Sequence, residues 1–409
     1  MLRSMFAGVS GLRSHQTVMD VVGNNIANVN TAGFKASTVT FAESISQVLR
    51  GASGTSADRA GINPAQIGLG VKVAQIEGVF TQGASQATGR NTDLAIQGDG
   101  FFIVDDGAGG RAYTRLGSFT FDELGMLATG AGAFVQGWQA DASGAIDTNG
   151  PVQNLQVPLG QVIDPIPTSE VSVGGSLSSD TAIGGVATTS IEIFDSLGVA
   201  HELMLTFTKT ALNDWSVAGT IDGNAATLAP AVVQFDTSGQ LTSAPTLALS
   251  GYTPPGAAAL TFDIELGSSL PLVQFGGEST MEAKNKDGQA IGHLTGFSIS
   301  DTGVIDGQFS NGESKTLGQI ATASFSNPAG LLRATDSTYQ VSVNSGEPLV
   351  GMPGTGNRGL MSSGTLEMSN VDLSREFTNL IIAQRGFQAN SRVITTTDEL
   401  LSDLVNIKR

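Results

Sequence analysis

The sequence has 409 residues, no cysteine and a formal net charge of −17 at pH 7. The lack of cysteine excludes disulfides, Cys-ligated zinc and thiol nucleophiles, and the acidity argues against nucleic-acid binding, which needs a basic face. Only 14% of the residues are charged, 53 are glycine, and no apolar run approaches the roughly 18 residues of a membrane span. This composition suits many short strands joined by tight turns.

The N-terminal segment is typical of an amphipathic helix. Its apolar residues recur at spacings of three, four and seven, which places one stripe along the helix. The stripe consists of Met5, Val9, Leu12, Met19, Val22, Ile26 and Val29. Gly33 is a candidate C-cap for this helix. Ser, Arg and His interrupt the apolar residues at the start of the sequence, so we expect no secretory signal peptide.

Asn24, Asn25, Asn28 and Asn30 crowd the end of this helix, although asparagine is a poor helix former. Two interpretations stay open. In the first, three of them (Asn24, Asn25 and Asn28) form hydrogen bonds to neighbouring copies or to the turn at 31–33, and so fix the packing register. In the second, the asparagines only cap and end the helix.

Between residues 36 and 366 the sequence predicts mainly strands, with 39–49 as a candidate short helix. Three segments have the pattern of a hairpin, namely 93–106 around Gly98–Gly100, 118–129 around Asp122–Gly125, and 190–208 around Ser196–Gly198. Proline-rich stretches mark candidate boundaries at 151–167, 254–255 and 347–359.

The C-terminal segment carries the strongest periodicity. Spacings of four and three alternate without a break, as in a heptad seam. The seam consists of Leu373, Phe377, Leu380, Gln384, Phe387, Ser391, Ile394, Asp398, Leu401 and Val405. One column of this seam is wholly apolar, whereas the other is polar in its middle, at Gln384, Ser391 and Asp398. At about 1.5 Å per residue the helix would be roughly 50 Å long.

Both ends of the chain are helical and the middle is rich in strands, so we expect an α+β fold. Long N- and C-terminal helices would pair in a coiled-coil-like manner, with mainly-β domains nested between them. Because a pair of helices leaves apolar surface uncovered, copies of the chain should pack on one another. The expected assembly interface comprises Val9, Leu12, Met19, Val22, Asn24, Asn25, Ile26, Asn28, Leu373, Phe377, Leu380, Gln384, Phe387, Ser391, Ile394, Asp398, Leu401 and Val405.

The sequence offers no catalytic constellation. The three histidines, His15, His201 and His293, lie in separate segments. The Gly98–Gly100 motif is followed by a predicted strand, whereas a dinucleotide-binding loop precedes a helix. Residues 141–150 resemble a calcium loop in composition but lack the glutamate that such a loop needs at position twelve. We therefore expect no enzyme activity, no catalytic residue, no cofactor and no metal site.

Residues 10–35, with the core NNIANVNTAGFK, closely resemble the N-terminal signature of the bacterial flagellar axial proteins, the family of rod, hook and hook-associated proteins. Residues 91–104 and 113–127 are similar to the β-domain motifs of that family. Two later segments, 307–331 and 363–409, are most like its hook members. The recognisable motifs cover about half of the chain.

The resemblance implies a nested architecture. A helical inner-tube domain would comprise 1–32 and 366–409, a connecting region 33–72 and 352–365, and an inner β-domain 73–146 and 286–351. The remaining residues, 147–285, would form an outer, solvent-facing β-domain. Residues 146–285 hold 14 acidic residues against Lys209 and Lys284, a net charge of −12, which suits such a position.

The resemblance also implies a function. The chain would be a structural subunit that self-assembles into the curved tubular hook, the flexible joint that transmits torque from rod to filament. It would lie outside the cell after export by the flagellar type III apparatus. Its partners would be copies of itself, the rod and hook-associated proteins at the two ends, the hook cap and the length-control proteins, with no nucleic acid and no membrane insertion.

Three alternatives remain at this point. The first is another axial protein, such as the distal rod protein, which usually lacks so large a central insertion. The second is a secreted adhesin or surface-layer module, which leaves the C-terminal heptads without a role. The third is an enzyme within residues 150–280, which a pocket of clustered acids around a bound metal would support.

Overall fold

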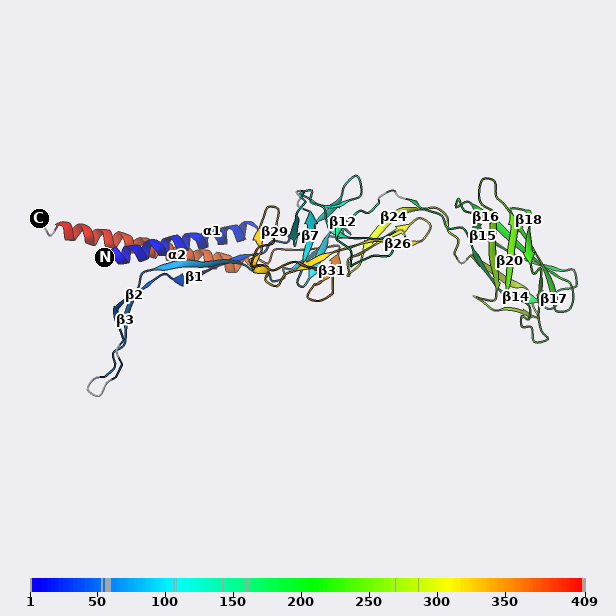
Figure 1. Ribbon diagram of the computed structural model, residues 1–409, viewed down its shortest axis with the longest axis horizontal. Helices are drawn as coiled ribbons and strands as arrows, with labels where there is room; N and C mark the ends of the chain where they lie inside the picture. Colours follow the sequence, from blue (N-terminus) through cyan, green and yellow to red (C-terminus); the bar gives the residue numbers. More distant parts are fainter. Residues whose placement is uncertain are drawn as a thin grey trace. The chain divides into compact units, whose positions relative to one another are not determined.

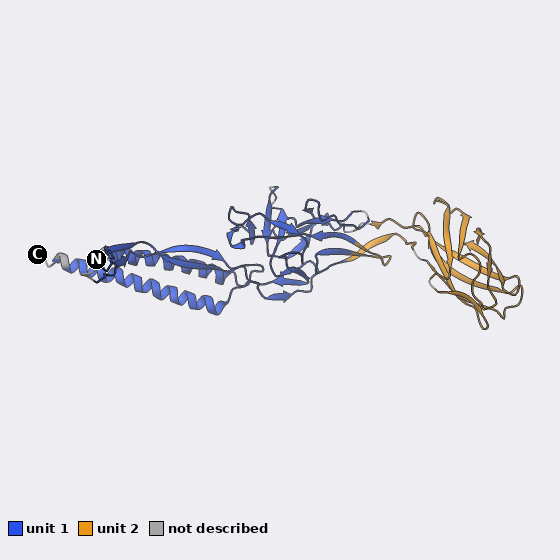
Figure 2. Ribbon diagram, turned by 60° about the horizontal axis from the view of Figure 1, so that its bottom comes forward, with its two compact units in different colours: residues 1–158, 297–306, 316–409 blue, residues 159–296, 307–315 orange. Residues whose placement is uncertain are grey.

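The computed structural model of this chain describes residues 2–52, 54–55, 60–105, 107, 109–141, 143–158, 160, 162–268, 270–285 and 287–406. They form two compact units, coloured separately in Figure 2. Unit 1 comprises residues 1–158, 297–306 and 316–409, and unit 2 comprises residues 159–296 and 307–315. Unit 1 therefore takes both ends of the chain, and unit 2 is inserted between them. The four domain boundaries expected from the resemblance stay a prediction.

Two long helices, α1 (Leu2–Ala27) and α2 (Leu373–Asn406), lie side by side in unit 1 (Figure 1). They run antiparallel, because Gly8 lies against Ile394 while His15 lies against Gly386. Across the described residues, no helix combines the length and the apolar character that crossing a membrane requires.

The contact between the helices is built from small side chains. Gly8, Gly11 and Ser14 are buried on α1. A Cβ atom added at Gly11 would lie 2.6 Å from the side chain of Asn390, and one added at Gly386 would lie 2.5 Å from the ring of His15. The absence of a side chain at Gly11 and Gly386 therefore leaves room for the Asn390 side chain and the His15 ring.

The side chains that α2 buries are not the heptad columns expected from the sequence. The buried ones are Glu376, Ala383 and Thr397, with Asn390 half-buried, all at seven-residue multiples. The apolar column expected from the sequence is half-buried at Leu380, Phe387, Ile394 and Leu401, and Phe377, Gln384 and Asp398 of the other column are exposed. Within one copy, the contact with α1 therefore follows small and polar residues, with Ile394 of the expected seam against Gly8, and the role of the seam in assembly stays a prediction.

A β-ribbon accompanies the helices. β1 (Ser37–Glu43) pairs with β4 (Val71–Gly78) and packs on α1, and β2 (Ser46–Arg50) pairs with β3 (Ala65–Gly68) (Figure 1). The prediction of a short helix at 39–49 is therefore wrong. Val39 pairs with Ile76, and the β-branched residues Thr38 and Thr40 flank it, which favours a strand over a helix.

The rest of unit 1 consists of short strands. Three antiparallel pairs are β5 (Ser85–Ala87) with β32 (Thr365–Glu367), β6 (Leu94–Gln97) with β31 (Leu360–Ser363), and β9 (Phe119–Phe121) with β10 (Leu127–Thr129). A six-stranded sheet has the order β28 (Leu332–Arg333), β29 (Thr338–Gln340), β8 (Arg111–Thr114), β7 (Phe101–Asp105), β27 (Thr322–Ser324) and β30 (Leu349–Gly351). The short 3-10 helix η1 (Pro328–Gly330) lies between β27 and β28 in the chain.

An aromatic cluster forms the core of that sheet. The rings of Phe101 and Phe325 meet edge to face with centroids 5.7 Å apart, and those of Tyr113 and Phe325 with centroids 4.8 Å apart. β7 and β27 are buried along nearly their whole length, so the sheet is covered on both faces.

A second six-stranded sheet contains the strands in which the chain passes between the units. Its order is β12 (Gln153–Asn154), β11 (Gln136–Gln139), β26 (Ser314–Ile320), β25 (Val304–Phe309), β24 (Gly292–Ile299) and β13 (Val162–Ile163). Within β24, β25 and β26 some residues belong to unit 1 and others to unit 2.

Unit 2 contains a ten-stranded sheet. Its main path is β15 (Val186–Phe194), β16 (Ala200–Lys209), β17 (Asp214–Ile221), β18 (Asn224–Ala229), β20 (Thr246–Tyr252), β21 (Leu260–Leu266), β14 (Glu170–Ser178) and β22 (Leu272–Phe275). β19 (Val232–Gln234) pairs with β17, and β23 (Thr280–Asn285) pairs with β14. β15 also contacts β23, so the sheet folds over onto one core, with Trp215 and Phe207 fully buried in it.

Two of the three expected hairpins are present. β9 pairs with β10, and β15 pairs with β16 around the turn that Gly198 closes by donating to the Asp195 carbonyl. The hairpin expected at 93–106 is wrong. β6 pairs with β31 and β7 pairs with β8, so Gly98–Gly100 joins strands of two different sheets.

Candidate assembly surface

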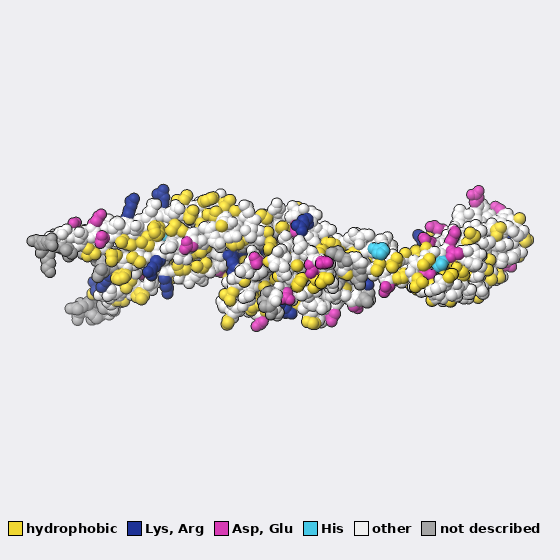
Figure 3. All heavy atoms as spheres, turned by 90° about the horizontal axis from the view of Figure 1, so that it is seen from above, with side chains coloured by type: hydrophobic (Ala, Val, Ile, Leu, Met, Phe, Trp, Pro, Cys, Tyr) yellow, Lys and Arg dark blue, Asp and Glu magenta, His cyan; other side chains and the backbone are white. Residues whose placement is uncertain are grey.

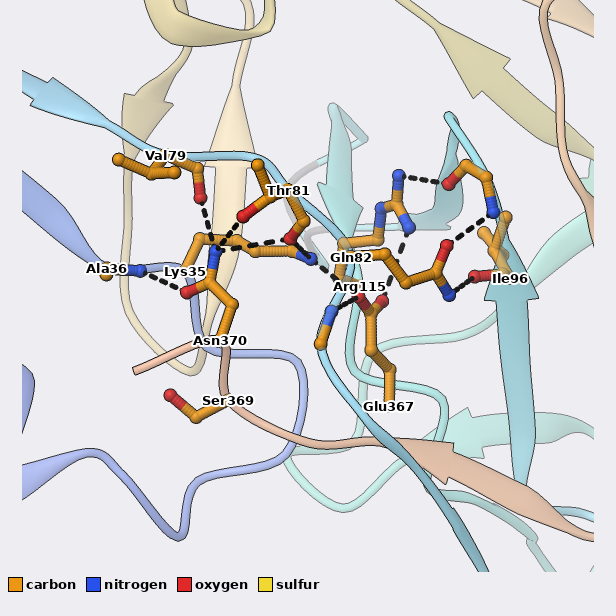
Figure 4. Close-up of polar contacts among 12 residues, drawn as sticks. Lys35, Ala36, Val79, Thr81, Gln82, Ile96, Arg115, Glu367, Ser369 and Asn370 are labelled. Atoms are coloured by element: carbon orange, nitrogen blue, oxygen red, sulfur yellow. Dashed lines mark hydrogen bonds and ion pairs between the residues drawn. The ribbon is translucent and has the colours of Figure 1, made fainter. Parts of the chain in front are cut away.

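A buried cluster of charges lies in unit 1 where the chain leaves the β-body for the helices (Figure 4). The Lys35 Nζ lies 2.6 Å from Glu367 Oε1, and the Arg115 Nη1 lies 3.3 Å from Glu367 Oε2, with Lys35 and Glu367 fully buried and Arg115 nearly so. Lys35 also donates to the Thr81 carbonyl, and Arg115 to the Gly98 carbonyl. The Glu367 carboxylate therefore forms ion pairs with both Lys35 and Arg115, which lie far from it in the sequence.

The burial of the cluster changes the pKa of both cations. Burial lowers the pKa of Lys35, and the hydrogen bond and the charge of Glu367 oppose this only in part. Burial likewise lowers the pKa of Arg115, against the same carboxylate. Since two cations face one anion in a low-dielectric site, loss of Glu367 would leave both uncompensated.

Asn370 completes this connection beside the charges. Its Oδ1 accepts from the Ala36 N–H at 2.8 Å, and its Nδ2 donates to the Val79 carbonyl at 2.8 Å and to Thr81 (Figure 4). Arg333 donates to the Lys35 carbonyl and lies over the Phe34 ring. The segment between α1 and β1 is thus joined to the segment that precedes α2.

The asparagines at the end of α1 divide between two tasks. Asn25 is fully buried, exchanges two hydrogen bonds with the backbone of Ser37 and donates to Glu376 Oε2 at 3.2 Å. Asn28 donates from Nδ2 to the carbonyl and the side chain of Asn24, and accepts from Thr31 Oγ1. Within one copy, Asn25 links α1 to α2, whereas Asn24 and Asn28 form local hydrogen bonds at the C-terminal end of α1.

The expected C-cap at Gly33 is wrong in place, because α1 ends at Ala27. Gly33 adopts φ +70°, and a Cβ atom there would lie 2.6 Å from the backbone nitrogen of Leu116. Its N–H donates to the Glu367 carbonyl. Glycine at this position permits contact between the chain after α1 and the β-body.

The expected interface residues are distributed as follows. Val22 and Asn25 are buried, Val9, Leu12, Met19, Ile26 and Asn28 are half-buried, and Asn24 is exposed. On α2, Leu373, Phe377, Gln384 and Asp398 are exposed, and Leu380, Phe387, Ser391, Ile394 and Leu401 are half-buried. The side chain of Val405 lies outside the described residues. Within one copy, Asn25 bonds to Glu376 rather than to the polar column of α2. An assembly role for these residues stays a prediction.

Large apolar side chains remain uncovered on the helices, and Figure 3 shows hydrophobic side chains gathered over the helical part of unit 1. On α2 the exposed ones are Leu373, Phe377, Ile381, Ile382, Val393 and Leu400. The heptad seam expected from the sequence does not include Ile381, Ile382, Val393 or Leu400. A spacing of four at Leu373, Phe377 and Ile381 could have revealed Ile381, because residues four apart share a helix face.

A groove of about 320 Å³ lies between α1, α2 and β1, and of these exposed side chains Ile382 lines it. The residues that line it include His15, Val18, Val39, Phe41, Arg375, Asn379 and Ile382. The His15 ring meets the Phe41 ring edge to face with centroids 5.7 Å apart. The groove is therefore open to solvent and partly apolar.

His201 in unit 2 is the one histidine with charged partners among the described residues. Its Nδ1 lies 2.5 Å from Asp222 Oδ2 and its Nε2 lies 3.3 Å from Asp195 Oδ2. Burial alone would lower the pKa of His201, but the two aspartates outweigh it and raise that pKa. Because both ring nitrogens are engaged, the imidazole is held as a structural link rather than as a free base.

The loop with calcium-like composition is a turn in which the Asp141 carboxylate accepts from the N–H groups of Ser143 and Ala145. In the described part of the chain, no group of three or more histidines and acids could hold a metal ion.

Four family models match the chain. They are described as Flagella basal body rod protein (residues 5–35), Flagellar hook protein FlgE/F/G D1 domain (95–175), Flagellar basal body protein FlaE D2 domain (177–289) and Flagellar basal body rod FlgEFG protein C-terminal (362–407). Together they extend from one terminal helix to the other.

The chain is also similar to whole proteins. It is 39% identical to the flagellar hook protein FlgE of Treponema pallidum and 38% identical to that of Borreliella burgdorferi, in each case over 100% of both chains. The crystal structure of Helicobacter pylori flagellar hook protein FlgE2 matches with a TM-score of 0.51 at 14% identity, over 69% of this chain and 100% of that one. That likeness concerns the fold alone.

Proposed function

This chain belongs to the flagellar hook protein family, and we propose that the exposed faces of its terminal helices are the surfaces through which copies polymerise. It is a structural subunit of the flagellar hook, and its location is the flagellum. A distal rod protein is the less favoured alternative, since the hook proteins are 39% and 38% identical to the chain, whereas the flagellar basal-body rod protein FlgG of Bacillus subtilis is 32% identical over 100% of both chains.

One observation carries the proposal. α1 and α2 meet through small and polar side chains, so their large apolar side chains stay exposed on the faces of α2. Apolar surface removed from water contributes roughly 25 cal/mol per Å², so a row of such residues favours association. Contiguous exposed apolar patches usually mark interaction sites.

We further propose that the paired helices pack against those of neighbouring copies in a coiled-coil-like manner and line the inner tube. The polar residues Gln384, Ser391 and Asp398 would then lie among the contacts between copies. Polar residues in such a seam lower its stability, so contacts between copies would exchange more readily than in an all-apolar seam. Such exchange is what a curved, rotating joint that transmits torque requires.

The export route and the assembly partners belong to the same proposal. We propose that the chain leaves the cell through the flagellar type III apparatus and that the hook cap and length-control proteins act during assembly. Rod and hook-associated proteins would bind at the two ends of the polymer. If the helices formed only on assembly, the contiguous apolar faces of α2 would not exist during export.

Electron microscopy of the purified chain after induced polymerisation tests the function. We expect curved tubes from the full-length protein and none from a variant lacking residues 1–30 and 371–409. A control variant, Leu212→Ser, changes an apolar side chain of unit 2 that is 82% exposed and should polymerise as the full-length chain does. Straight rods from the full-length protein would favour the rod alternative, and tubes from the truncated variant would contradict the role of the helices.

A further inference from the structure

Two uncovered features lie on different sides of α2. The first, called the α2 ridge, consists of Leu373, Phe377 and Ile381, which are 39%, 50% and 53% exposed. The second, called the helix–ribbon groove, is the 320 Å³ groove between α1, α2 and β1. We infer that the α2 ridge of one copy docks into the helix–ribbon groove of the next copy. This inference deepens the proposed function and rests on it.

The ridge cannot fill the groove of its own chain. Successive residues of an α-helix are about 100° apart around the axis. On α2 the groove is lined by Arg375, Asn379 and Ile382. Phe377 therefore lies about 200° from both Arg375 and Asn379 on the helix. The two features face different neighbours, and each needs a partner from outside the chain.

The chemistry of the two features is complementary. Val18, Val39, Phe41 and Ile382 give the groove apolar walls. Its polar groups come from His15, Ser37, Thr38, Arg375, Glu376 and Asn379. The ridge carries three large apolar side chains, and Leu380 and Gln384, its neighbours on that face, are uncharged. Docking would therefore bury apolar surface from both sides without removing a charge of the ridge from water.

The geometry also fits the kind of assembly expected of a hook. Contact between two identical patches closes a dimer, whereas contact between two different patches adds copies without end when the rotation does not close. Ridge and groove are two different patches on one subunit. A single ridge-to-groove contact, repeated, would generate a helical array.

Cysteine cross-linking of the polymer tests the inference, because the chain contains no cysteine of its own. One variant carries Phe377→Cys in the ridge, another carries Val39→Cys in the groove, and a third carries both. After polymerisation and mild oxidation, the double variant should give a ladder of covalent oligomers. An equal mixture of the single variants should stop at the dimer, and each single variant alone should stay monomeric.

A second pair, Ile381→Cys with Val18→Cys, guards against a first pair that is poorly placed or fails to polymerise, and a short thiol-to-thiol cross-linker relaxes the strict geometry of a disulfide. Polymers in which neither pair cross-links would overturn the inference while leaving the proposed function intact. Dimers from the Phe377→Cys variant alone would also overturn it, since they would indicate ridge-to-ridge contact. If the cysteine-free parent forms no polymer, the proposed function fails and this inference with it.

Discussion

At the scale of single residues, the buried carboxylate of Glu367 connects distant segments of unit 1. Its carboxylate accepts from Lys35, Arg115 and the Gly83 N–H, and so joins the segment before β1 to the start of the C-terminal segment. Breaking a buried ion pair by removing one partner costs far more than the pair contributes, because the remaining charge stays buried.

We expect Glu367→Gln to lower the free energy of unfolding of unit 1 by about 3–5 kcal/mol. Lys35→Met should cost less, because Glu367 then still balances Arg115. The chain has two tryptophans, one in each unit, so Trp138 fluorescence in a Trp215→Phe background reports on unit 1 during urea unfolding. A larger loss in Lys35→Met than in Glu367→Gln would contradict this account of the charges.

His201 should make the stability of unit 2 depend on pH. Its pKa is raised in the folded state, so its bonds to Asp195 and Asp222 stabilise the fold below about pH 6.5, the ordinary value, and are lost as pH rises through the folded pKa. Asp195 and Asp222 have lowered pKa values, so their contribution is lost instead as the pH falls into the acid range. Tyr252 packs its ring against that of His201.

The measurement uses Trp215 fluorescence in a Trp138→Phe background. The melting temperature of unit 2 should fall as the pH rises from about 6.5 through the raised pKa of folded His201, and His201→Gln should flatten this dependence. Parallel pH profiles for His201→Gln and its parent would show that another group titrates.

The sequence indicated that the asparagines at the end of α1 matter, but it could not give their partners. Asn25 bonds to Glu376, which lies 351 positions away in the sequence. A glutamate in the first turn of a helix has the pattern of an ordinary solvated charge, because negative charges are favoured there. Only the packing of α2 on α1 turns Glu376 into a buried partner.

At the scale of elements, local patterns predicted where helices and hairpins lie better than what they contact. Apolar periodicity indicated both long helices, and the hairpins β9–β10 and β15–β16 follow from turn residues between adjacent strands. The pairing of β6 with β31 joins strands more than 250 residues apart, and no local signal specifies it. The face of α2 that meets α1 was also missed, because small residues give little signal in a search for apolar stripes.

Gly386 tests the small-residue contact between the helices. Alanine at a helical glycine normally stabilises the helix by about 1 kcal/mol, and Gly23→Ala, with nothing within 4 Å of the new Cβ, should do so. Gly386→Ala should instead destabilise by about 1–3 kcal/mol, because its Cβ meets the His15 ring. The temperature at which polymers disassemble measures both effects. His15→Ala should rescue Gly386→Ala, and equal behaviour of the two alanine variants would contradict the close contact.

At the scale of the whole molecule, the apolar surface that favours assembly and most of the net negative charge lie in different units. The exposed apolar faces of the helices belong to unit 1, whereas residues 167–288 of unit 2 hold 13 acidic and three basic residues, a net charge of −10 out of −17. Net charge of one sign keeps a protein soluble through self-repulsion, and salt screens that repulsion. The acidic unit therefore opposes the association that the helices drive.

Deleting residues 167–288 separates these two effects. Ile166 and Gln289 are paired in an antiparallel bridge, so a short Gly/Ser turn can join them without disturbing β13 or β24. We expect this variant to polymerise at a lower protein concentration than the full chain and with a weaker dependence on salt, because the helical faces remain while most of the repulsion is gone.

Sedimentation at several ionic strengths, with electron microscopy of the pellets, measures the outcome. A matched control keeps unit 2 and replaces Asp180, Asp214 and Asp236 with asparagine, which removes charge but no domain. An intermediate salt dependence for this control would assign the effect to charge rather than to size. If the deletion variant keeps a folded unit 1 by Trp138 fluorescence and still forms no polymer, then unit 2 makes a contact on which assembly depends, and the helices alone do not suffice.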